Sequence, residues 1–575
     1  MAIDLTPEQR ATGKTNFART ADGLTRRGFM KSLAVTGGAL AVAAPAAYFG
    51  YKSIDGKPVK AVLIGGGDEG GVLVGEHNPK YLEFIAVCDI RPWNMKRIFD
   101  GDPKVALRKG FKKVYGEDSA KRIKKLDSYD AFLSELRDNK DIEAVVIALP
   151  LCMHAKAAID AMKIGKERDK PIHVLTEKLM AWNIKQCKQM IRTAKECGSL
   201  LSVGHQRHYS MLYAHATEVV NPPDIPGVSK IPSVLGDIRH IRALWHRNFS
   251  WPFDSKTVED MVSDKEATKP FYRDGWFPPI LREDYDALAD KKDMLKKYGF
   301  DNIEQLVRWR LHQATGGGLM AELGSHQLDA ASIFLGHVHP LAVSGVGVRS
   351  FFGPGHNDRD IDDHVFATYE FPGKNYDPKK NPDDKVIVTY SSISTNGFEN
   401  YGECVMGTRG TLIVEKEESV MLFPENPPGK VKTPARGTEV GVSSSGKDKP
   451  VLETGSTWGG PSVTVTGTAI GSPARVSRGY TEEMEDFAYC VRLWDPKLGY
   501  EKEKDKDGKS KYKQRLTRCH GEVAMVDAIV ALTANYAMHT DKGKPERVEF
   551  NPDWFDADKL EAVPPSDQKA KVEIA

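Results

Sequence analysis

The feature that most constrains this chain is a glycine-rich turn directly after a short apolar run. The run Val59–Ile64 leads into Gly65-Gly66-Gly67-Asp68-Glu69-Gly70, in which Gly65, Gly67 and Gly70 satisfy the pattern G-x-G-x-x-G. Glycines permit a tight turn and let the backbone approach a pyrophosphate at the N-terminus of the next helix, whose partial positive charge favours an anion. Taken alone, the pattern also fits an ordinary glycine-rich turn.

Asp89 supplies the second half of the pattern. It ends the next apolar run, Phe84–Cys88, where a dinucleotide-binding fold needs a carboxylate to hold the ribose 2′-OH. The strand before the glycines and the acid after them predict a Rossmann-type site for NAD. Arg91 stands close to Asp89 and leaves NADP possible, because an arginine here can accept a 2′-phosphate.

Short apolar runs alternate with helical patterns as far as residue 205, which is typical of βαβ units and a parallel sheet. Three of these runs end at Pro150, at Glu177-Lys178 and at His205-Gln206-Arg207. Ligands of parallel sheets bind beyond the carboxyl ends of the strands. We therefore expect these side chains to face one crevice, with His205 and Arg207 as candidate substrate contacts.

The second half of the chain changes character, because its apolar residues alternate with polar ones as in half-buried antiparallel strands. The alternating runs are 233–245, 343–352, 363–371, 386–394 and 403–414. The predicted fold class is α/β, with an N-terminal Rossmann dinucleotide-binding domain and a C-terminal α+β domain that has a large, mostly antiparallel open sheet. The expected divisions are a signal and linker at 1–55, the NAD(P)-binding domain at 56–205, the second domain at 206–545 with insertions at about 246–308 and 424–478, and a tail at 546–575.

The two insertions carry different expectations. The segment 246–308 is aromatic and charged, and is interpreted as a lid or rim of the site. The segment 424–478 is rich in Gly, Ser, Pro and Thr, which indicates a long surface loop. That loop is either a linker or a contact between subunits.

Charge and cysteine usage exclude several classes of partner. The 575 residues include 81 Lys and Arg against 79 Asp and Glu, so no global field favours nucleic acid or an anionic membrane. The seven cysteines are scattered without a C-x-x-C pair, which argues against a disulfide framework and a zinc site. The histidines also lack close ligand spacing, so no metal is predicted. We expect a small molecule as the partner.

The N-terminus resembles a twin-arginine export signal. Arg26-Arg27 precedes the small, apolar and uncharged stretch Ser32–Ala47, which contains the cleavage candidate Ala44-Pro45-Ala46. A membrane anchor or a buried helix is the alternative, but the stretch falls short of the roughly 20 residues that span a bilayer. We expect export to the periplasm by a route that carries folded proteins, with no membrane span after processing. Whether the signal is cleaved or retained stays open.

Six motifs follow one another along the chain: Gly65–Gly70, Cys88-Asp89, Ala148-Leu149-Pro150 with His154, Glu177-Lys178, the block 316–329 (GGGLMAELGSHQLD) and the run 407–412 (GTRGTL). Their types and order resemble the Gfo/Idh/MocA oxidoreductase family, which includes glucose-fructose oxidoreductase and inositol dehydrogenase. The resemblance covers about residues 58–540. It implies NAD or NADP as the cofactor, a carbohydrate or polyol substrate, and homo-oligomers formed through the C-terminal sheet.

The resemblance also assigns roles to residues. Lys178 corresponds to the lysine of the family's Glu-Lys-Pro motif near the nicotinamide, His326 to the proposed acid/base, and Glu322 to a position that is often aspartate. Pro150, His154 and Glu177 fall at cofactor-binding positions. Three departures leave the reaction open: Leu179 replaces the proline, which is often in a cis peptide; glutamate stands at 322; and Leu151 follows Pro150 where relatives have Asn or Asp.

The chemistry of alcohol oxidation gives these residues distinct tasks. Hydride leaves the carbon while a base takes the hydroxyl proton, and a base works best when its pKa lies near the working pH. Histidine meets that condition better than lysine, so His326 is the expected base and Lys178 polarises the substrate oxygen. Glu322, His326 and Asp329 would share one helical face, where a carboxylate could orient His326 and Asp329 could contact substrate.

The sequence therefore predicts an NAD(P)-dependent oxidoreductase acting on a sugar or polyol hydroxyl, with the nucleotide retained between turnovers. Two alternatives remain. One is a glycoside-cleaving enzyme that oxidises its substrate transiently and releases the leaving group by elimination. The other is a non-catalytic protein that binds the nucleotide structurally.

Overall fold

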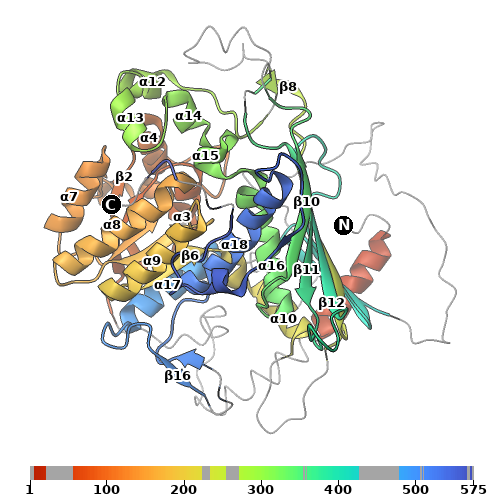
Figure 1. Ribbon diagram of the computed structural model, residues 1–575. Coiled ribbons are helices and arrows are strands. Elements are labelled where there is room, and N and C mark those ends of the chain that lie inside the picture. Colours follow the sequence, from red (N-terminus) through yellow and green to blue (C-terminus); the bar gives the residue numbers. More distant parts are fainter. Residues whose placement is uncertain are drawn as a thin grey trace.

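A computed structural model shows two sheets flanked by helices (Figure 1). It describes residues 5–20, 56–222, 233–253, 271–353, 356–425, 478–505 and 508–572, except 273, 358, 509, 566, 568 and 569. The twin-arginine segment, residues 254–270 of the 246–308 segment and most of the 424–478 segment lie outside the described residues.

The first sheet is parallel and has the strand order β3-β2-β1-β4-β5-β6, which is the order of a Rossmann dinucleotide-binding sheet. Its strands are β1 (Val59–Ile64), β2 (Leu82–Cys88), β3 (Lys124–Leu126), β4 (Ala144–Ile147), β5 (His173–Glu177) and β6 (Leu201–Gly204). The fold class predicted from the sequence is confirmed. The short strand β3 has only one buried residue, Leu126, and gave no apolar run to detect.

Apolar residues fill both faces of this sheet, as a parallel sheet covered by helices requires. In β1, Val62 and Ile64 point into one core, whereas Ala61 and Leu63 point into the other. The surrounding helices are α3 (Asp68–Glu76), α4 (Pro92–Asp100), α5 (Phe111–Tyr115), α6 (Glu117–Ala120), α7 (Tyr129–Asp138), η1 (Leu151–Met153), α8 (His154–Glu167), α9 (Ile184–Cys197) and η2 (Gln206–His208). The next helix, α10 (Met211–Val220), packs on α16 and on β15 of the second sheet.

The second sheet has the order β15-β14-β13-β7-β12-β11-β10-β18 and is antiparallel except between β7 and β12. Its strands are β7 (Ile238–His246), β10 (Ala342–Val348), β11 (His364–Pro372), β12 (Lys385–Ile393), β13 (Tyr401–Gly407), β14 (Gly410–Glu415), β15 (Ser419–Pro424) and β18 (Val548–Glu549). One expectation was wrong: the run 403–414 is two strands, because the chain turns at Thr408-Arg409 and β13 pairs with β14.

Helices from the C-terminal half cover the inner face of this sheet and reach the first sheet. The π-helical turn η5 (Met320–Gly324) runs into α16 (Ser325–Leu335), which lies with α18 (Gly521–Met538) between the two sheets (Figure 1). The helix α17 (Tyr480–Leu493) packs on the Rossmann sheet, where Met484 and Phe487 join the core of β1 and β2. Residues far along the chain therefore complete the first domain.

The segment before η5 forms short helices over the carboxyl edge of the Rossmann sheet (Figure 1). Its elements are α12 (Arg282–Leu288), α13 (Lys292–Lys297), α14 (Ile303–Val307), η4 (Trp309–Leu311) and α15 (Gln313–Gly316). The remaining short elements are β8 (Pro252–Phe253), β9 (Phe271–Tyr272), β16 (Lys502–Lys504), β17 (Ser510–Tyr512) and η6 (Pro552–Phe555).

Three further features bear on the sequence predictions. All seven cysteines are buried free thiols. A helix at residues 7–20 lies against the second sheet, where Arg10 pairs with Glu415 at 2.8 Å. Within the described residues, the structure holds no helix with the length and hydrophobicity needed to cross a membrane.

Candidate active site

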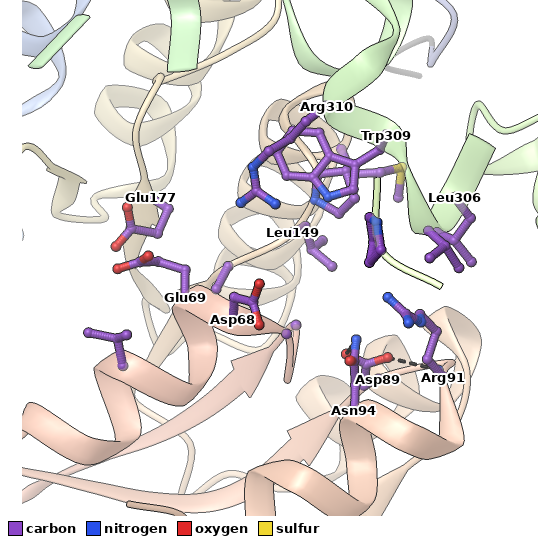
Figure 2. A pocket seen from close by; sticks show the side chains of 18 of the residues that line it. Asp68, Glu69, Asp89, Arg91, Asn94, Leu149, Glu177, Leu306, Trp309 and Arg310 are labelled. Atoms are coloured by element: carbon purple, nitrogen blue, oxygen red, sulfur yellow. Dashed lines mark hydrogen bonds between the residues drawn. The ribbon is translucent and has the colours of Figure 1, made fainter. Parts of the chain in front are cut away.

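A cavity of about 450 Å³ opens at the carboxyl ends of β1, β4 and β5. The glycine turn and Asp89 line one part of it, and Lys178, Glu322 and His326 line another. Figure 2 shows side chains of the Rossmann domain around this space, with Leu306, Trp309 and Arg310 from the segment that covers its edge. The residues predicted for the cofactor and for the chemistry therefore share one cavity, although Glu322 and His326 lie more than 200 positions after Asp89 in the sequence.

The three glycines of the motif have different physical roles. Gly65 has φ +101°, and a Cβ there would lie 2.2 Å from the Ala148 carbonyl oxygen. A Cβ on Gly70 would lie 2.0 Å from the Gly65 carbonyl oxygen, so Gly70 permits close packing of α3 on β1. Gly67, by contrast, lines the cavity, and its Cβ would meet only Asn94 Nδ2 at 3.8 Å. Among the three glycines of the motif, only Gly67 could therefore carry a side chain without a clash inside the protein, so the space beside it is free for a ligand.

Asp89 lies beside this turn and is held by the backbone. Its Oδ2 accepts hydrogen bonds from the Gly66 amide at 2.7 Å and from Asn94 Nδ2 at 3.1 Å, while Oδ1 accepts from the Arg91 amide at 2.8 Å. Burial raises the pKa of Asp89, against the opposing effect of these donors. The carboxylate is thereby fixed at the cavity wall, in the place where a ribose would bind.

Arg91 is occupied by an acid from the segment that covers the site. Its guanidinium pairs with the fully buried Asp284 of α12 at 2.8–2.9 Å, and Asp284 also accepts from the Trp93 amide at 3.0 Å. The charge that an arginine could offer to a 2′-phosphate is therefore already paired.

The first turn of α3 carries two acids, which would oppose an anion if both were charged and unpaired. Asp68 pairs with Arg97 at 2.8 Å and with Arg108 at 3.1 Å. Burial raises the pKa of Glu69, which keeps this carboxyl closer to its neutral form. The helix N-terminus thus remains compatible with a bound pyrophosphate.

At the other end of the cavity, Lys178 and Glu322 form a polar contact. Lys178 Nζ donates to the Glu322 carbonyl oxygen at 3.0 Å and lies 3.9 Å from its Oε2. Arg310 Nε donates to the same Oε2 at 2.8 Å. Burial disfavours the charged carboxylate, but Lys178 and Arg310 outweigh it and hold the pKa of Glu322 below its usual value. The Lys178–Leu179 peptide is cis although leucine replaces proline.

His326 faces the same space from the first turn of α16. Its ring lies 5.6 Å from the ring of Trp245, and among the described residues no hydrogen bond engages either ring nitrogen. Burial, together with the charges of Lys178 and Arg207, lowers the pKa of His326 well below its ordinary value. The imidazole is therefore neutral near pH 7 and has a lone pair that can accept a proton.

The remaining predicted cofactor residues divide into two groups. Pro150 and Glu177 line the cavity, and burial beside Glu69 raises the pKa of Glu177 well above its usual range. His154 does not line it. Its buried ring lies 2.9 Å from the Leu179 carbonyl oxygen and 2.8 Å from that of Leu149, so it joins two cavity-forming turns from behind.

The predicted substrate contacts His205, Arg207 and Asp329 require correction, because all three are buried outside the cavity lining. Arg207 pairs with Glu417 at 2.7 Å and with Glu403 at 3.1 Å. Asp329 accepts a hydrogen bond from His208 at 2.6 Å if that nitrogen carries the proton. The neighbouring Gln206 lines the cavity instead.

The physical reason for this difference lies in the backbone. The Ser325 amide bonds to the Met320 carbonyl across a π-helical turn, so Glu322, His326 and Asp329 do not follow one regular α-helical face. Glu322 and His326 reach the cavity, whereas Asp329 points to η2. Within the part of the chain that the structure describes, no carboxylate hydrogen-bonds to His326 in the way expected from the i, i+4 spacing.

Sequence reasoning missed one wall of the cavity. Trp276 lines it from the segment 246–308, which was interpreted only as a lid or rim, and Trp309 and Arg310 line it from the residues directly after that segment. The high aromatic content of this segment was the available signal, but no spacing rule connected it to the Rossmann edge. Arg478 and Tyr480, at the start of α17, also line the cavity and were not singled out.

The fold and the site define a two-domain dinucleotide-binding protein with a glycine turn, a ribose acid and a Lys/Glu/His cluster. Residues 59–205 match the oxidoreductase family described by its NAD-binding Rossmann fold, and residues 296–413 match the Gfo/Idh/MocA C-terminal domain. The chain belongs to the Gfo/Idh/MocA oxidoreductase family, and its first domain is an NAD-binding Rossmann domain.

The similarity to individual curated proteins is either low in sequence identity or limited to a small part of the chain. The 2,7-anhydro-N-acetylneuraminate hydratase of Escherichia coli K12 is 20% identical over 307 residues, which cover 53% of this chain and 59% of that protein. A glycosyl hydrolase family 109 protein from Stenotrophomonas maltophilia is 34% identical over 111 residues, or 19% of this chain and 22% of that protein. The match thus spans less than two thirds of either relative.

Among solved structures, an inositol dehydrogenase homologue from Azotobacter vinelandii in complex with NADH and myo-inositol has the same fold. Its TM-score is 0.50 at 14% identity, with 86% of this chain and 98% of that chain covered. At this identity the likeness concerns the fold.

Proposed function

We propose that the protein transfers hydride between a secondary hydroxyl of a sugar or polyol and NAD. One observation carries the proposal: the cavity joins Gly67 and Asp89 to Lys178, Glu322 and His326. A cofactor held at the first pair reaches toward the second group without leaving the cavity.

The residues present suit the nucleotide. The open space at Gly67 admits a pyrophosphate to the N-terminus of α3, and Asp89 retains lone pairs that can accept from a ribose hydroxyl. The bound nicotinamide supplies the hydride acceptor or donor. The Arg91–Asp284 pair favours NAD over NADP, since it leaves no unpaired charge at Arg91 for a 2′-phosphate.

The three residues at the other end have complementary roles in oxidation. Neutral His326 takes the hydroxyl proton as hydride leaves the carbon. Lys178 donates a hydrogen bond to the substrate oxygen and stabilises negative charge on it. Glu322 and Arg310 hold the Lys178 side chain in place.

The substrate class is proposed from the cavity and the relatives. Trp245, Trp276 and Trp309 line it, and apolar aromatic walls with a few placed polar groups are typical of small-ligand sites. The structural neighbour was solved with myo-inositol, and a curated relative acts on an anhydro sugar according to its name.

A second candidate is glycoside cleavage through transient oxidation and elimination. Two observations favour it: relatives include a hydratase and a glycosyl hydrolase family 109 protein, and Glu177 and Glu69 have raised pKa values because they are buried. A carboxyl whose pKa is raised keeps its proton to a higher pH than an ordinary glutamate and can pass it to a departing oxygen. Release of sugar from a glycoside without accumulation of NADH would support elimination; steady NADH formation would exclude it as the net reaction.

The direct test uses a panel of sugars and polyols with purified protein and NAD, followed by nicotinamide absorbance. Lys178→Met and His326→Ala should each lower turnover of an identified substrate by about 10²-fold or more, the usual contribution of general acid/base and oxyanion groups. Full activity in either variant would remove this mechanism. Nucleotide binding with no turnover of any substrate would support the non-catalytic alternative.

We also propose export by the twin-arginine route and assembly into homo-oligomers through the second sheet. Free nicotinamide nucleotide is expected to be scarce outside the cytoplasm, so the cofactor would be bound before export. Replacing Arg26 and Arg27 by lysine should block export of the full-length chain. Export that is unaffected would contradict this route.

A further inference from the structure

A second group of polar side chains lies buried between the two sheets, behind the cavity and outside its lining. His205 follows β6, Asp329 lies on α16 and Asp527 on α18, and their exposed fractions are 1%, 1% and 2%. His208 of η2 and Cys519, just before α18, adjoin them. Three separate stretches of the chain thus bring nitrogen, oxygen and sulfur atoms to one closed position.

The central atoms of this group have no hydrogen-bond partner among the described residues. These atoms are both ring nitrogens of His205, Oδ2 of Asp329 and Oδ2 of Asp527. Leaving one buried polar group unsatisfied costs about 1–3 kcal/mol, and more if it is charged. The two carboxyl groups can satisfy each other only if Asp527 keeps a proton. Both nitrogens of His205 stay without a partner even then, so the group indicates a ligand that bonds to it.

The distances between the His205 nitrogens and the two carboxylates are too long for direct hydrogen bonds, but they suit ligands of one cation. His205 Nδ1 lies 3.8 Å from Asp329 Oδ2, and His205 Nε2 lies 3.9 Å from Asp527 Oδ2. Both distances exceed the ~3.2 Å limit of a good hydrogen bond. Two ligand atoms at about 2.0–2.2 Å from a tetrahedral zinc ion are roughly 3.4 Å apart, so small movements would close the group around one ion.

We propose that His205, Asp329 and Asp527 bind one divalent transition-metal ion, Zn²⁺ by preference. Ligand atoms of the three residues lie within 4.8 Å of one another, and Cys519 offers a fourth donor within the same distance of Asp527. Mixed imidazole, carboxylate and thiolate donors suit Zn²⁺ rather than Ca²⁺ or Mg²⁺, which take mainly oxygen. His208, bonded to Asp329 Oδ1 at 2.6 Å, orients that carboxylate from outside, as partners of metal ligands commonly do.

The site is closed and separate from the cavity, which is typical of a structural metal. The ion would join the end of β6 in the first domain to α16 and α18 in the second. Asp329 also lies on the helix that carries His326, so the ion would fix His326 relative to Lys178. This positioning role rests on the proposed function, whereas metal binding itself does not.

The same residues admit one metal-free arrangement. Burial and the neighbouring Asp329 raise the pKa of Asp527 well above its usual value, so Asp527 could keep a proton and donate it to Asp329. This arrangement leaves both nitrogens of His205 unsatisfied. It also makes a distinct prediction, because asparagine at 527 could donate the same hydrogen bond.

The primary test is the metal content of the full-length protein, purified without a histidine tag or chelator and measured by mass spectrometry of the elements. We expect about one zinc ion per chain. A zinc chelator should lower the melting temperature, and added Zn²⁺ should restore it. Less than about 0.1 transition-metal ion per chain, with no stabilisation by added Zn²⁺, would overturn the proposal.

Variants separate the two arrangements. Asp527→Asn should reduce zinc occupancy at least about tenfold and abolish the effect of the chelator on melting. Asp362→Asn is the matched control, since Asp362 faces His539 at 2.7 Å near the surface, and it should retain full occupancy. Full zinc occupancy in Asp527→Asn would contradict the assigned ligands.

Cobalt gives a readout that does not require any variant to fold. Wild-type protein reconstituted with Co²⁺ should show the visible absorption of a tetrahedral centre, with a thiolate charge-transfer band from Cys519. Absence of cobalt absorption at stoichiometric Co²⁺ would contradict the site. None of these measurements depends on NAD or on a substrate, so failure of the metal site and failure of the proposed function are distinguishable.

Discussion

Replacing Gly67 with alanine separates the needs of the cofactor from the needs of the fold. The new Cβ would lie 3.8 Å from Asn94 Nδ2, an ordinary contact, and the backbone there has a negative φ of −70°. Alanine at a helix N-cap lowers the free energy of unfolding by about 0.5 kcal/mol relative to glycine. Alanine also makes the unfolded chain less flexible, which raises the free energy of unfolding by about the same amount. The melting temperature should change little.

The same Cβ points into the space that a pyrophosphate needs. We expect the affinity of the Gly67→Ala variant for NAD to fall at least tenfold, which corresponds to about 1.4 kcal/mol. Calorimetric titration with NAD and with NADH measures this affinity, and thermal unfolding without nucleotide measures the stability.

Gly70→Ala is the matched comparison. Its Cβ would lie 2.0 Å from the Gly65 carbonyl oxygen, so α3 must move away from β1. We expect a loss of about 1–3 kcal/mol of stability, as for other overpacked positions. If Gly67→Ala binds NAD with unchanged affinity, the pyrophosphate does not approach this turn and the assignment of the cofactor site is wrong.

Three further predictions follow from the site and the second sheet. Asp284→Asn removes the partner of Arg91 and should raise affinity for NADP relative to NAD, measured by parallel titrations; an unchanged ratio would show that Arg91 does not face the 2′ position. In the oxidation direction, kcat/KM should persist below pH 6.5, because the lowered pKa of His326 means that acid protonates this base only at lower pH; half-loss at or above pH 6.5 would contradict a neutral His326. Phe366 is 44% exposed on β11 opposite Val346 of β10, so Phe366→Asp should dissociate an oligomer formed through this face, and light scattering that shows the same mass as wild type would exclude it.

Much of the fold could be predicted because its signals are local. The runs that became β1 and β2 are continuous and apolar, since a parallel sheet buries both faces, and the spacing of Gly65–Gly70 reports the turn after β1 directly. The hairpin of β13 and β14 was missed because Thr408-Arg409 interrupts the alternation without a strong turn signal at those two positions.

The site was harder to predict from the sequence than the fold, because its geometry depends on contacts between distant segments. Lys178 and His326 were found through motifs at strand and helix ends, and the structure places both at one cavity. Arg207 has the same local signal, a polar residue after a strand, yet it is drawn away by the buried acids Glu403 and Glu417. The sequence around Arg207 contains nothing that reveals those partners.

The most direct test of the central claim is mass spectrometry of the small molecules released when natively purified protein is denatured, with unoccupied protein afterwards titrated with NAD. We expect NAD or NADH, either released from the protein or bound in the titration at one per chain. If the protein releases no nicotinamide nucleotide and binds neither NAD nor NADP, the glycine turn holds no cofactor and the proposed hydride transfer is contradicted.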